Sequence, residues 1–281
     1  MKYIFFGSPR FAAIVLKNLI AAGFPPAALV ANPDRPVGRK KVITPPATKA
    51  LLAEKNIDAK IFQPEKFDEQ FIASLKTIAP DFFVVAAYAK IIPQSVLGIP
   101  RLGTLGTHPS LLPRYRGASP IQSVILNGER ETGATIYMMD AKMDHGAILA
   151  SEKIAIDPLH VQYPELEETL GNLSGKILAA IIPQLIARTT ASTTQDEGAA
   201  TFTKKFTTDN AYVDADEIAK AETHDAALAK TIIQKINALT PEPGVWTKQN
   251  GVRIKLLAAE LRDGKLFLTC TQKEGGKPVR H

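Results

Sequence analysis

The chain has 281 residues, enough for one large domain or two modest ones, and 45% of them are hydrophobic, which excludes wholesale disorder. Its only cysteine, Cys270, excludes an internal disulfide framework and a thiolate metal cluster within one chain. The formal net charge of +6 suits a polyanionic partner such as nucleic acid, but it also describes many proteins without one.

The first part of the chain alternates strand and helix signals. An apolar run over residues 2–6 stops at Gly7-Ser8-Pro9, and a helical apolar pattern follows through residues 11–19. Further apolar runs at 27–31 and 82–87 predict buried strands, and segments 47–56 and 67–78 have helical composition. Together they predict an α/β, Rossmann-like domain with a mostly parallel sheet and helices on both faces.

Ligands of such sheets bind beyond the carboxyl ends of the strands, so we expect the chemistry in the loops after Phe6, Ala31, Ala87 and residues 103–107. The run at 2–6 is too short for a secretion signal, and no segment approaches the roughly 20 apolar residues that span a bilayer. We therefore expect a cytoplasmic protein with no membrane partner.

The second part of the chain has a different pattern. A helical pattern at 170–186 is followed by a small, polar stretch at 189–198, which we interpret as a linker between domains. After a helical segment near 225–239 come apolar runs at 252–257 and 266–271, bounded by the turn signals Asn250-Gly251 and Asp263-Gly264. This pattern predicts a small β-rich domain.

The densest group of chemically useful residues lies at 107–117, a loop with two prolines and a glycine that contains His108. Histidine suits proton transfer near neutral pH. A structural histidine in a rigid turn is the other interpretation, and the loop alone does not decide between them.

A second polar turn, at 139–146, contains Asp140, Asp144 and His145. A carboxylate beside a histidine orients the imidazole and stabilises its protonated form. Both aspartates qualify by residue type, and spacing does not choose between them, since aspartate and glycine also serve such turns for backbone reasons.

The segment 33–41 is a loop rich in proline and glycine that carries four cations, Arg35, Arg39, Lys40 and Lys41. It is interpreted either as a phosphate-binding loop for a large anionic substrate or as a solvated basic loop. No dinucleotide fingerprint, P-loop, H-E-x-x-H or paired C-x-x-C motif is present in the sequence, so we expect no nicotinamide cofactor and no metal.

Several segments together resemble the 10-formyltetrahydrofolate-dependent formyltransferases. The resemblance is carried by Ser110-Leu111-Leu112-Pro113-Arg114-Tyr115-Arg116-Gly117, with His108 before it and Asp144 after it. It extends over these further segments: Phe6-Gly7-Ser8-Pro9-Arg10-Phe11, Ala87-Tyr88-Ala89-Lys90-Ile91-Ile92-Pro93, Gly117-Ala118-Ser119-Pro120-Ile121-Gln122 and Glu131-Thr132-Gly133-Ala134-Thr135-Ile136.

Within that family, the basic loop and a C-terminal domain after a linker look like the members that act on methionyl-tRNA. The resemblance implies a catalytic domain at 1–188, a linker at 189–203 and a smaller OB-like β-barrel domain at 204–281. It also implies 10-formyltetrahydrofolate as co-substrate and methionyl initiator tRNA as acceptor. We expect the chain to act as a monomer.

The resemblance implies catalytic roles for His108 and Asp144. It places the folate at Ser110, Leu111, Leu112 and Pro113, with Tyr88, Lys90, Ile91 and Ile92, and the tRNA at Arg35, Arg39, Lys40 and Lys41. The third catalytic position departs from the family pattern, because Gly106 stands where the family has an asparagine. The loss of one oxyanion donor costs roughly 10²- to 10³-fold in rate, so we expect another donor or a water to replace it. Position 145 also departs from the family pattern, because His145 stands where the family often has a small polar residue.

Three rival functions remain. An amino-sugar formyltransferase shares the folate site but lacks the basic loop and this second domain. A glycinamide ribonucleotide formyltransferase needs only the first domain. A homologue that binds tRNA or folate without catalysis is suggested by Gly106.

Overall fold

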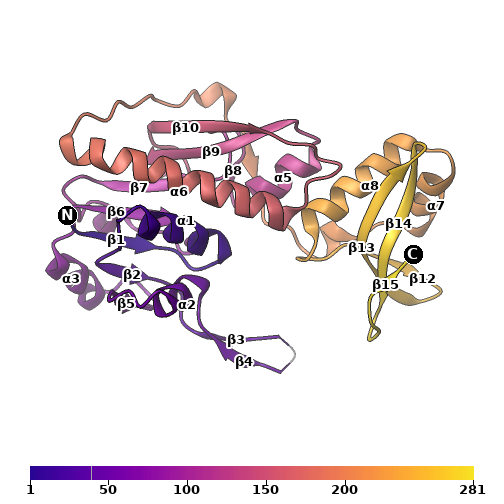
Figure 1. The fold of residues 1–281 in the computed structure, drawn as a ribbon, viewed down its shortest axis with the longest axis horizontal. Helices are drawn as coiled ribbons and strands as arrows, with labels where there is room; N and C mark the ends of the chain where they lie inside the picture. The colour runs from indigo at the N-terminus through magenta and orange to yellow at the C-terminus, as the bar shows by residue number, and fades with distance from the viewer. Residues whose placement is uncertain (39) are drawn as a thin grey trace. The chain divides into compact units, whose positions relative to one another are not determined.

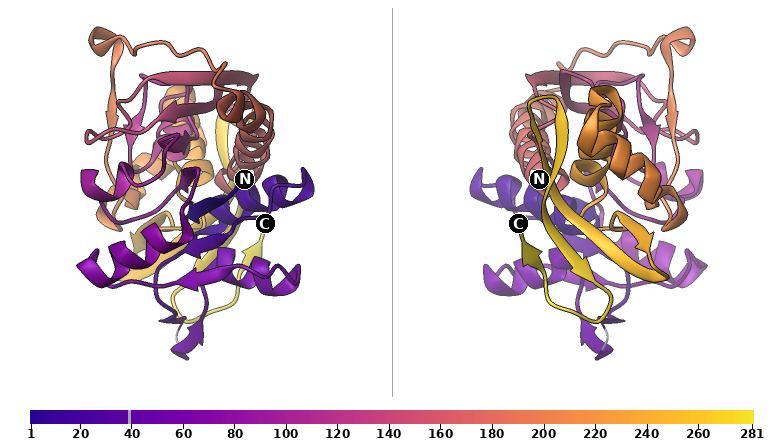
Figure 2. Two further views of the ribbon diagram at one scale, coloured as in Figure 1. Left: turned by 90° about the vertical axis from the view of Figure 1, so that its left-hand side faces the viewer. Right: turned by 90° about the vertical axis from the view of Figure 1, so that its right-hand side faces the viewer.

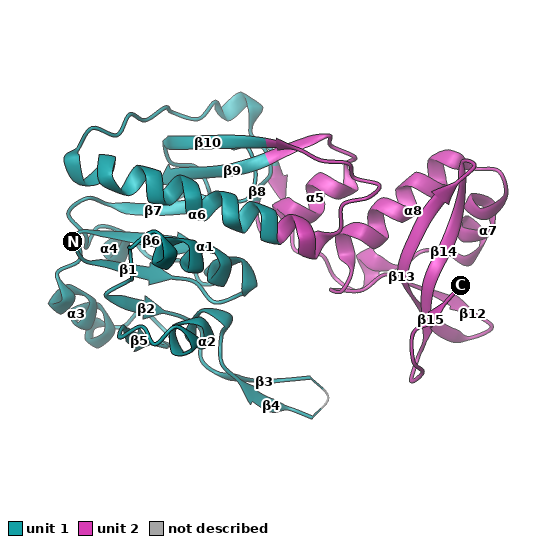
Figure 3. Ribbon diagram, viewed as in Figure 1, with its two compact units in different colours: residues 1–116, 133–153, 168–201 teal, residues 117–132, 154–167, 202–281 magenta. Residues whose placement is uncertain are grey.

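A computed structural model of the protein describes residues 1–38 and 40–281. The chain divides into two compact units, each built from several segments (Figure 3). Unit 1 contains Met1–Arg116, Gly133–Lys153 and Glu168–Thr201, and unit 2 contains Gly117–Thr132, Ile154–Glu167 and Phe202–His281. The domain boundaries expected from the sequence, 1–188 and 204–281 with a linker at 189–203, stay a prediction.

A seven-stranded sheet forms the frame of unit 1, in the order β10-β9-β7-β6-β1-β2-β5 (Figure 1). The five strands from β7 to β5 are mutually parallel, and β9 runs antiparallel to β7. The strands are β1 (Tyr3–Phe6), β2 (Ala28–Val30), β5 (Lys60–Phe62), β6 (Phe82–Ala86), β7 (Thr104–His108), β9 (Glu131–Met138) and β10 (Ile148–Ala155). The predicted mostly parallel α/β fold is confirmed.

Helices lie on both faces of this sheet, as Figure 2 shows from two sides. On one face, a buried cluster joins Ile4 and Phe6 of β1 to α3 (Glu69–Ile78) and α4 (Gln94–Leu97). Phe5 points to the other face, beside Ala12 of α1 (Arg10–Ala21), where a Cβ on Gly7 would lie within 2.9 Å of both side chains. That face also carries α2 (Ala47–Glu54), which contacts α1.

The basic segment expected as a loop folds instead as a β-hairpin of β3 (Arg35–Val37) and β4 (Val42–Thr44). Its β-branched residues Val42, Ile43 and Thr44 favour extended backbone, and Gly38 takes a positive φ of 71° in the turn. The prediction of a loop over 33–41 was therefore wrong where these two short strands form. Arg39 lies outside the described residues.

Unit 2 contains a four-stranded antiparallel sheet, β12 (Trp246–Gln249), β13 (Val252–Arg262), β14 (Lys265–Lys273) and β15 (Val279–Arg280). Asn250-Gly251 and Asp263-Gly264 form its two-residue turns, and all four residues have positive φ, as type I′ hairpins require. The helices of this unit are α5 (Pro120–Leu126), α7 (Ala215–Thr223) and α8 (Ala226–Leu239). The small β-rich domain is confirmed, and the sheet is consistent with a barrel-like form.

The segment expected as a linker contains a short 3₁₀ helix, η1 (Glu197–Ala199), and strand β11 (Phe202–Thr203). Thr193 also forms a bridge with Ile148. The remaining short elements are β8 (Arg116–Gly117) and the 3₁₀ helix η2 (Asp209–Ala211). The stretch 189–203 therefore has regular structure that its polar composition did not predict.

Helix α6 (Tyr163–Ala187) is long and apolar enough to cross a bilayer by length and composition, with a mean hydropathy of 1.4. The sequence patterns predicted no such segment, so this expectation was wrong. More than half of the apolar stretch of α6 is buried inside the fold. Gly171 and Gly175 of this helix lie against Ile14 and Asn18 of α1. Buried core helices share this pattern, so α6 is weak evidence for a membrane span.

Candidate active site

His108 ends strand β7, in the loop region where the topology predicts ligand binding. Its side chain is buried, and Nε2 lies 2.8 Å from the backbone oxygen of Tyr115. A carbonyl oxygen only accepts hydrogen bonds, so Nε2 carries a proton and Nδ1 is the acceptor nitrogen of the neutral ring. The sequence left open whether this histidine is structural, and the structure shows one ring nitrogen held and the other directed elsewhere.

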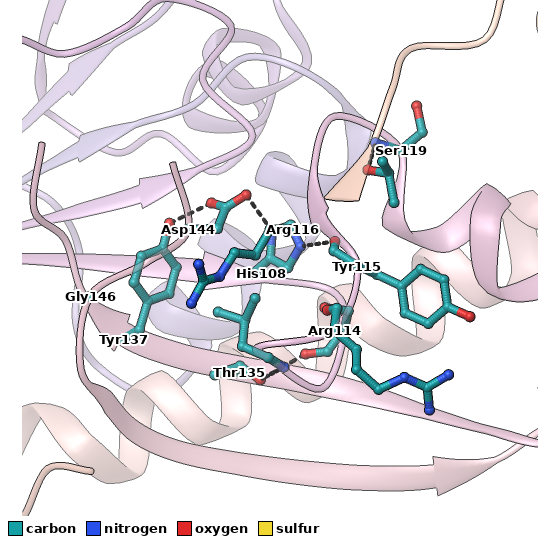
Figure 4. Close-up of polar contacts among 12 residues, drawn as sticks. His108, Arg114, Tyr115, Arg116, Ser119, Thr135, Tyr137, Asp144 and Gly146 are labelled. Atoms are coloured by element: carbon teal, nitrogen blue, oxygen red, sulfur yellow. Dashed lines mark hydrogen bonds and ion pairs between the residues drawn. The ribbon is translucent and has the colours of Figure 1, made fainter. Parts of the chain in front are cut away.

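That second nitrogen faces Asp144. His108 Nδ1 lies 3.6 Å from Asp144 Oδ2, while Asp144 Oδ1 accepts a hydrogen bond of 2.7 Å from the Tyr137 hydroxyl (Figure 4). The distance to Nδ1 is too long for a hydrogen bond, but it is within the range of an ion pair with a protonated imidazole. Asp144 can therefore stabilise a positive charge on His108.

Asp140, the other aspartate of this turn, belongs to a different pair. Its Oδ2 lies 2.6 Å from His145 Nδ1, and its Oδ1 accepts from the backbone N–H of Lys142 at 2.9 Å. Partial burial tends to raise the pKa of Asp140, but these hydrogen bonds prevail and lower it. The structure thus brings Asp144 and not Asp140 to His108, and gives His145 its own carboxylate partner.

Gly106 lies two residues before His108 on β7, directly opposite Tyr137 of β9. A Cβ built on Gly106 would lie 2.5 Å from atoms of the Tyr137 ring. Tyr137 is buried, and burial, followed by the nearby charge of Asp144, raises its pKa well above the usual value of 10. The space beside Gly106 is therefore filled by a protonated phenol.

The loop at 110–113 is held by hydrogen bonds to its own backbone and to β9. Ser110 is fully buried, and its hydroxyl donates to the backbone oxygen of Arg114. The Thr135 hydroxyl donates to the Ser110 oxygen at 2.7 Å and accepts from the Leu112 N–H. Leu111 is half-buried, and the Leu112-Pro113 peptide is cis. Thr135, which the sequence did not single out, thus holds the predicted folate loop.

The second predicted folate segment follows β6, the parallel neighbour of β7. The buried Tyr88 hydroxyl has no hydrogen-bond partner among the described residues, and burial raises the pKa of Tyr88 to about 12. Lys90 Nζ donates to the backbone oxygens of Pro64 and Glu65. Ile91 is 93% exposed, whereas Ile92 lies in the hydrophobic core. Ile91 therefore projects almost fully into solvent.

The hairpin β3–β4 presents its cations to solvent. Arg35, Lys40 and Lys41 are all exposed, and Arg35 forms a long ion pair of 3.8 Å with Glu65. The apolar side chains of Val37, Val42 and Ile43 are exposed beside them. The structure therefore places three of the four predicted tRNA-binding cations on one projecting element.

A buried arginine connects the expected linker to the turn that contains Asp144. Arg116, which is 2% exposed, donates to Gln195 Oε1 and to both carboxylate oxygens of Glu197. Gln195 Nε2 donates in turn to the backbone oxygens of Asp144 and Gly146, at 2.9 and 2.8 Å. The sequence did not predict this network, because its members lie about 50 to 80 residues apart along the chain.

Comparison with known proteins shows which family models the sequence matches. The sequence profile described as "Formyl transferase" matches residues 1–182, and "Formyl transferase, C-terminal domain" matches residues 226–278. A relative from Staphylococcus epidermidis named methionyl-tRNA formyltransferase is 37% identical over 94% of this chain and 81% of its own length. One of the same name from Thermotoga maritima is 36% identical over 94% and 80%.

Solved structures share the fold at low identity. Methionyl-tRNA formyltransferase from Clostridium thermocellum has a TM-score of 0.60 at 18% identity, with both chains fully covered. An N-formyltransferase from Helicobacter canadensis, solved with folinic acid and dTDP-3-aminofucose, has a TM-score of 0.64 at 17% identity and covers 100% of this chain and 99% of its own. At such identities the likeness extends to the fold alone.

Proposed function

The chain belongs to the formyl transferase family, and from that membership we propose that it transfers a formyl group from 10-formyltetrahydrofolate to the α-amine of methionyl-tRNA. The observation that carries the proposal is its similarity to relatives named methionyl-tRNA formyltransferase, at 34–39% identity over most of the chain. The reaction prepares an initiator tRNA for translation. We accordingly propose a cytoplasmic location and a monomer.

In the proposed mechanism, the neutral α-amine attacks the formyl carbon and forms a C–N bond, giving a tetrahedral intermediate. The bond from that carbon to N10 of the folate then breaks, and the proton lost by the amine is delivered to N10. Because Nε2 of His108 donates to Tyr115, Nδ1 is the atom able to take and return that proton. Asp144 stabilises the imidazolium in between.

The proposed folate site lies along the loops after β6 and β7. These strands are parallel neighbours, so the loops leave the same edge of the sheet. The Tyr88 hydroxyl has no hydrogen-bond partner among residues 1–38 and 40–281. This hydroxyl and the exposed Ile91 support a ligand on the first loop, and the half-buried Leu111 supports one on the second. We propose Lys90, Ile92, Ser110, Leu112 and Pro113 as the residues that shape these loops.

The proposed tRNA site is the hairpin β3–β4, through Arg35, Lys40 and Lys41, with Arg39 of the same turn outside the described residues. Exposed cations on a projecting hairpin can contact phosphates without a large desolvation cost. The match of residues 226–278 to the family's C-terminal domain supports the same acceptor, since the curated relatives also share this part of the chain.

Single-turnover formylation tests the proposal, with methionyl-tRNA and a nucleotide-linked amino sugar supplied as competing acceptors. We expect transfer from 10-formyltetrahydrofolate to the tRNA. Transfer to the sugar would contradict the proposed acceptor, and folate binding without any transfer would show that the chain has lost its chemistry.

Replacement of His108 by alanine tests the catalytic assignment. We expect the single-turnover rate to fall by about 10²- to 10⁴-fold, the usual range for a lost acid–base group, with folate affinity largely kept. His160→Ala is the matched control, because His160 is an exposed histidine that also pairs with an aspartate, Asp157. A His108→Ala enzyme as active as this control would overturn the assignment.

A further inference from the structure

Tyr137 is a buried titratable residue that the proposed mechanism does not yet use. In the register of β7 and β9, Tyr137 pairs with Gly106, and His108 pairs with Thr135. Residues directly opposite in an antiparallel pair point to the same face, as do residues two apart on one strand. The Tyr137 ring and the His108 imidazole therefore lie on one face of the sheet (Figure 4).

Tyr137 and Gly106 depend on each other sterically. A Cβ on Gly106 would lie 2.5 Å from Cε1 and Cζ of the ring and 2.8 Å from the hydroxyl oxygen, which is closer than a real Cβ approaches. Any side chain at position 106 would displace the phenol. The tyrosine thus occupies the volume into which a longer residue 106 would project.

The Tyr137 hydroxyl determines which way the Asp144 carboxylate faces. It donates to Oδ1 at 2.7 Å, and this leaves Oδ2 as the oxygen directed at His108 Nδ1. Asp144 has a positive φ of 49°, in a backbone region that aspartate visits only when local contacts support it. Burial keeps the phenol protonated, so it remains a donor throughout the neutral pH range.

We infer that Tyr137 is a positioning residue of this enzyme, whose hydroxyl orients Asp144 toward His108, and that Gly106 is a glycine because the phenol needs its space. The inference rests on the proposed formyl transfer. It accounts for the absence of an asparagine at position 106, because the Tyr137 ring from β9 occupies the volume that its side chain would need. It also makes positions 106 and 137 one functional unit.

Tyr137→Phe is the decisive variant, because it removes the hydroxyl and keeps the ring that packs on Gly106. We expect kcat for formyl transfer to fall about 10- to 100-fold, with KM for both substrates changed less than about 3-fold, as for an interaction that matters mainly in the transition state. A purely structural role would instead weaken substrate binding, so KM would rise together with the fall in kcat.

Tyr163→Phe is the matched control. Tyr163 also donates to a carboxylate, Glu167 Oε1 at 3.0 Å, but it lies on α6 in unit 2. We expect this variant to keep the kcat and the KM values of the wild type. A Tyr137→Phe enzyme that behaves in the same way would overturn the inference.

Variants at position 106 test the steric half of the inference. We expect Gly106→Ala to lower kcat at least about 10-fold in the wild type, but to change it less than about 3-fold in a Tyr137→Leu background, since residues that touch are not additive. Equal effects of Gly106→Ala in both backgrounds would contradict the pairing. If Tyr137→Leu does not fold, Tyr137→Phe decides alone.

The wild-type control separates this inference from the proposed function. A wild type that formylates neither methionyl-tRNA nor the amino sugar contradicts the proposed function, and the inference falls with it. A wild type that formylates the sugar contradicts only the acceptor, and the Tyr137 variants are then compared with that substrate. An active wild type with a fully active Tyr137→Phe overturns the inference alone.

Discussion

At the scale of single residues, the site depends on backbone conformations that residues other than glycine usually avoid. Three residues near the site have a positive φ: Ala87 (46°), Tyr115 (61°) and Asp144 (49°). Ala87 precedes the proposed folate residue Tyr88. The Tyr115 oxygen accepts the hydrogen bond from His108, and Asp144 faces His108 Nδ1. Each left-handed residue costs about 1 to 2 kcal/mol, so the surrounding structure must hold it. Contacts with the surrounding residues therefore stabilise the backbone conformation of these three residues.

Tyr88 gives a prediction about pH at the same scale. Burial raises its pKa from 10 to about 12. Between these values the unfolded state loses the Tyr88 proton and the folded state keeps it. The free energy of unfolding is therefore unaffected below pH 10 and falls as the pH rises toward 12. Tyr88→Phe removes this dependence. We expect the variant to gain about 1 kcal/mol relative to the wild type between pH 10 and 11, measured as the free energy of unfolding in urea.

The same pair of proteins compared at pH 8 is the control. The Tyr88 hydroxyl has no hydrogen-bond partner in the described part of the chain, so its removal should cost less than about 1 kcal/mol there. A difference between the two proteins that stays constant from pH 8 to 11 would show that Tyr88 does not titrate with this shift.

At the scale of elements, the hairpin β3–β4 carries a prediction about salt. Lys40→Ala with Lys41→Ala removes two exposed cations, and we expect weaker tRNA binding with kcat largely kept. The slope of log affinity against log salt should fall by about one for each phosphate that the variant no longer neutralises. Affinity measured across a salt series checks this.

Lys17→Ala on α1 is the matched control, because it removes an exposed lysine from a different element. Equal salt slopes for the wild type, this control and the hairpin variant would contradict a role for the hairpin in phosphate binding.

The segment that contains Gln195 carries a second prediction at this scale. Gln195→Ala removes two hydrogen bonds to the turn around Asp144 and one acceptor of the buried Arg116. We expect the free energy of unfolding to fall by about 1 to 3 kcal/mol. We expect the formylation rate to fall roughly 10-fold or more, because a displaced catalytic group loses its geometry.

Gln184→Ala is the control for this variant, since Gln184 on α6 is exposed and its side-chain amide donates to the backbone oxygen of Ala180 in the same helix. The two variants are compared by thermal unfolding and by their single-turnover formylation rates. A Gln195→Ala protein as stable and as active as Gln184→Ala would contradict the anchoring role of this segment.

At the scale of the whole molecule, neither compact unit is a continuous piece of chain. Unit 2 joins 117–132 and 154–167 to the C-terminal part, where Asn237 of α8 donates to the backbone oxygens of Pro158 and Leu159. Helix α8 also contacts α5. The C-terminal residues therefore complete a unit that begins within the first part of the chain.

This arrangement predicts that a fragment of residues 1–203 is destabilised. Removal of α8 takes away Ile232, Ile233, Ile236 and Leu239, which are all buried. Each such side chain contributes about 1.5 to 3 kcal/mol, so we expect a loss of more than about 5 kcal/mol, exposed apolar surface and binding of a hydrophobic dye. A fragment with the unfolding free energy of the full chain would show that residues 1–203 form an independent domain.

Local signals in the sequence determined much of this protein by themselves. Apolar runs located three strands of the parallel sheet, β1, β2 and β6, but not β5. Asn250-Gly251 and Asp263-Gly264 located two hairpin turns, and motif resemblance singled out His108 and Asp144. These features were predictable because strand period, turn conformation and motif spacing depend on residues close together in the chain.

Tertiary structure alone decided which of these residues meet. The choice of Asp144 over Asp140, the Tyr137 ring over Gly106, and the anchoring of the Asp144 turn by Gln195 all depend on strand register or on contacts between distant segments. A shift of one residue between β7 and β9 would turn Tyr137 to the opposite face, and no local pattern records that register. The structure therefore shows what fills the volume beside the glycine at position 106, namely the buried phenol of Tyr137.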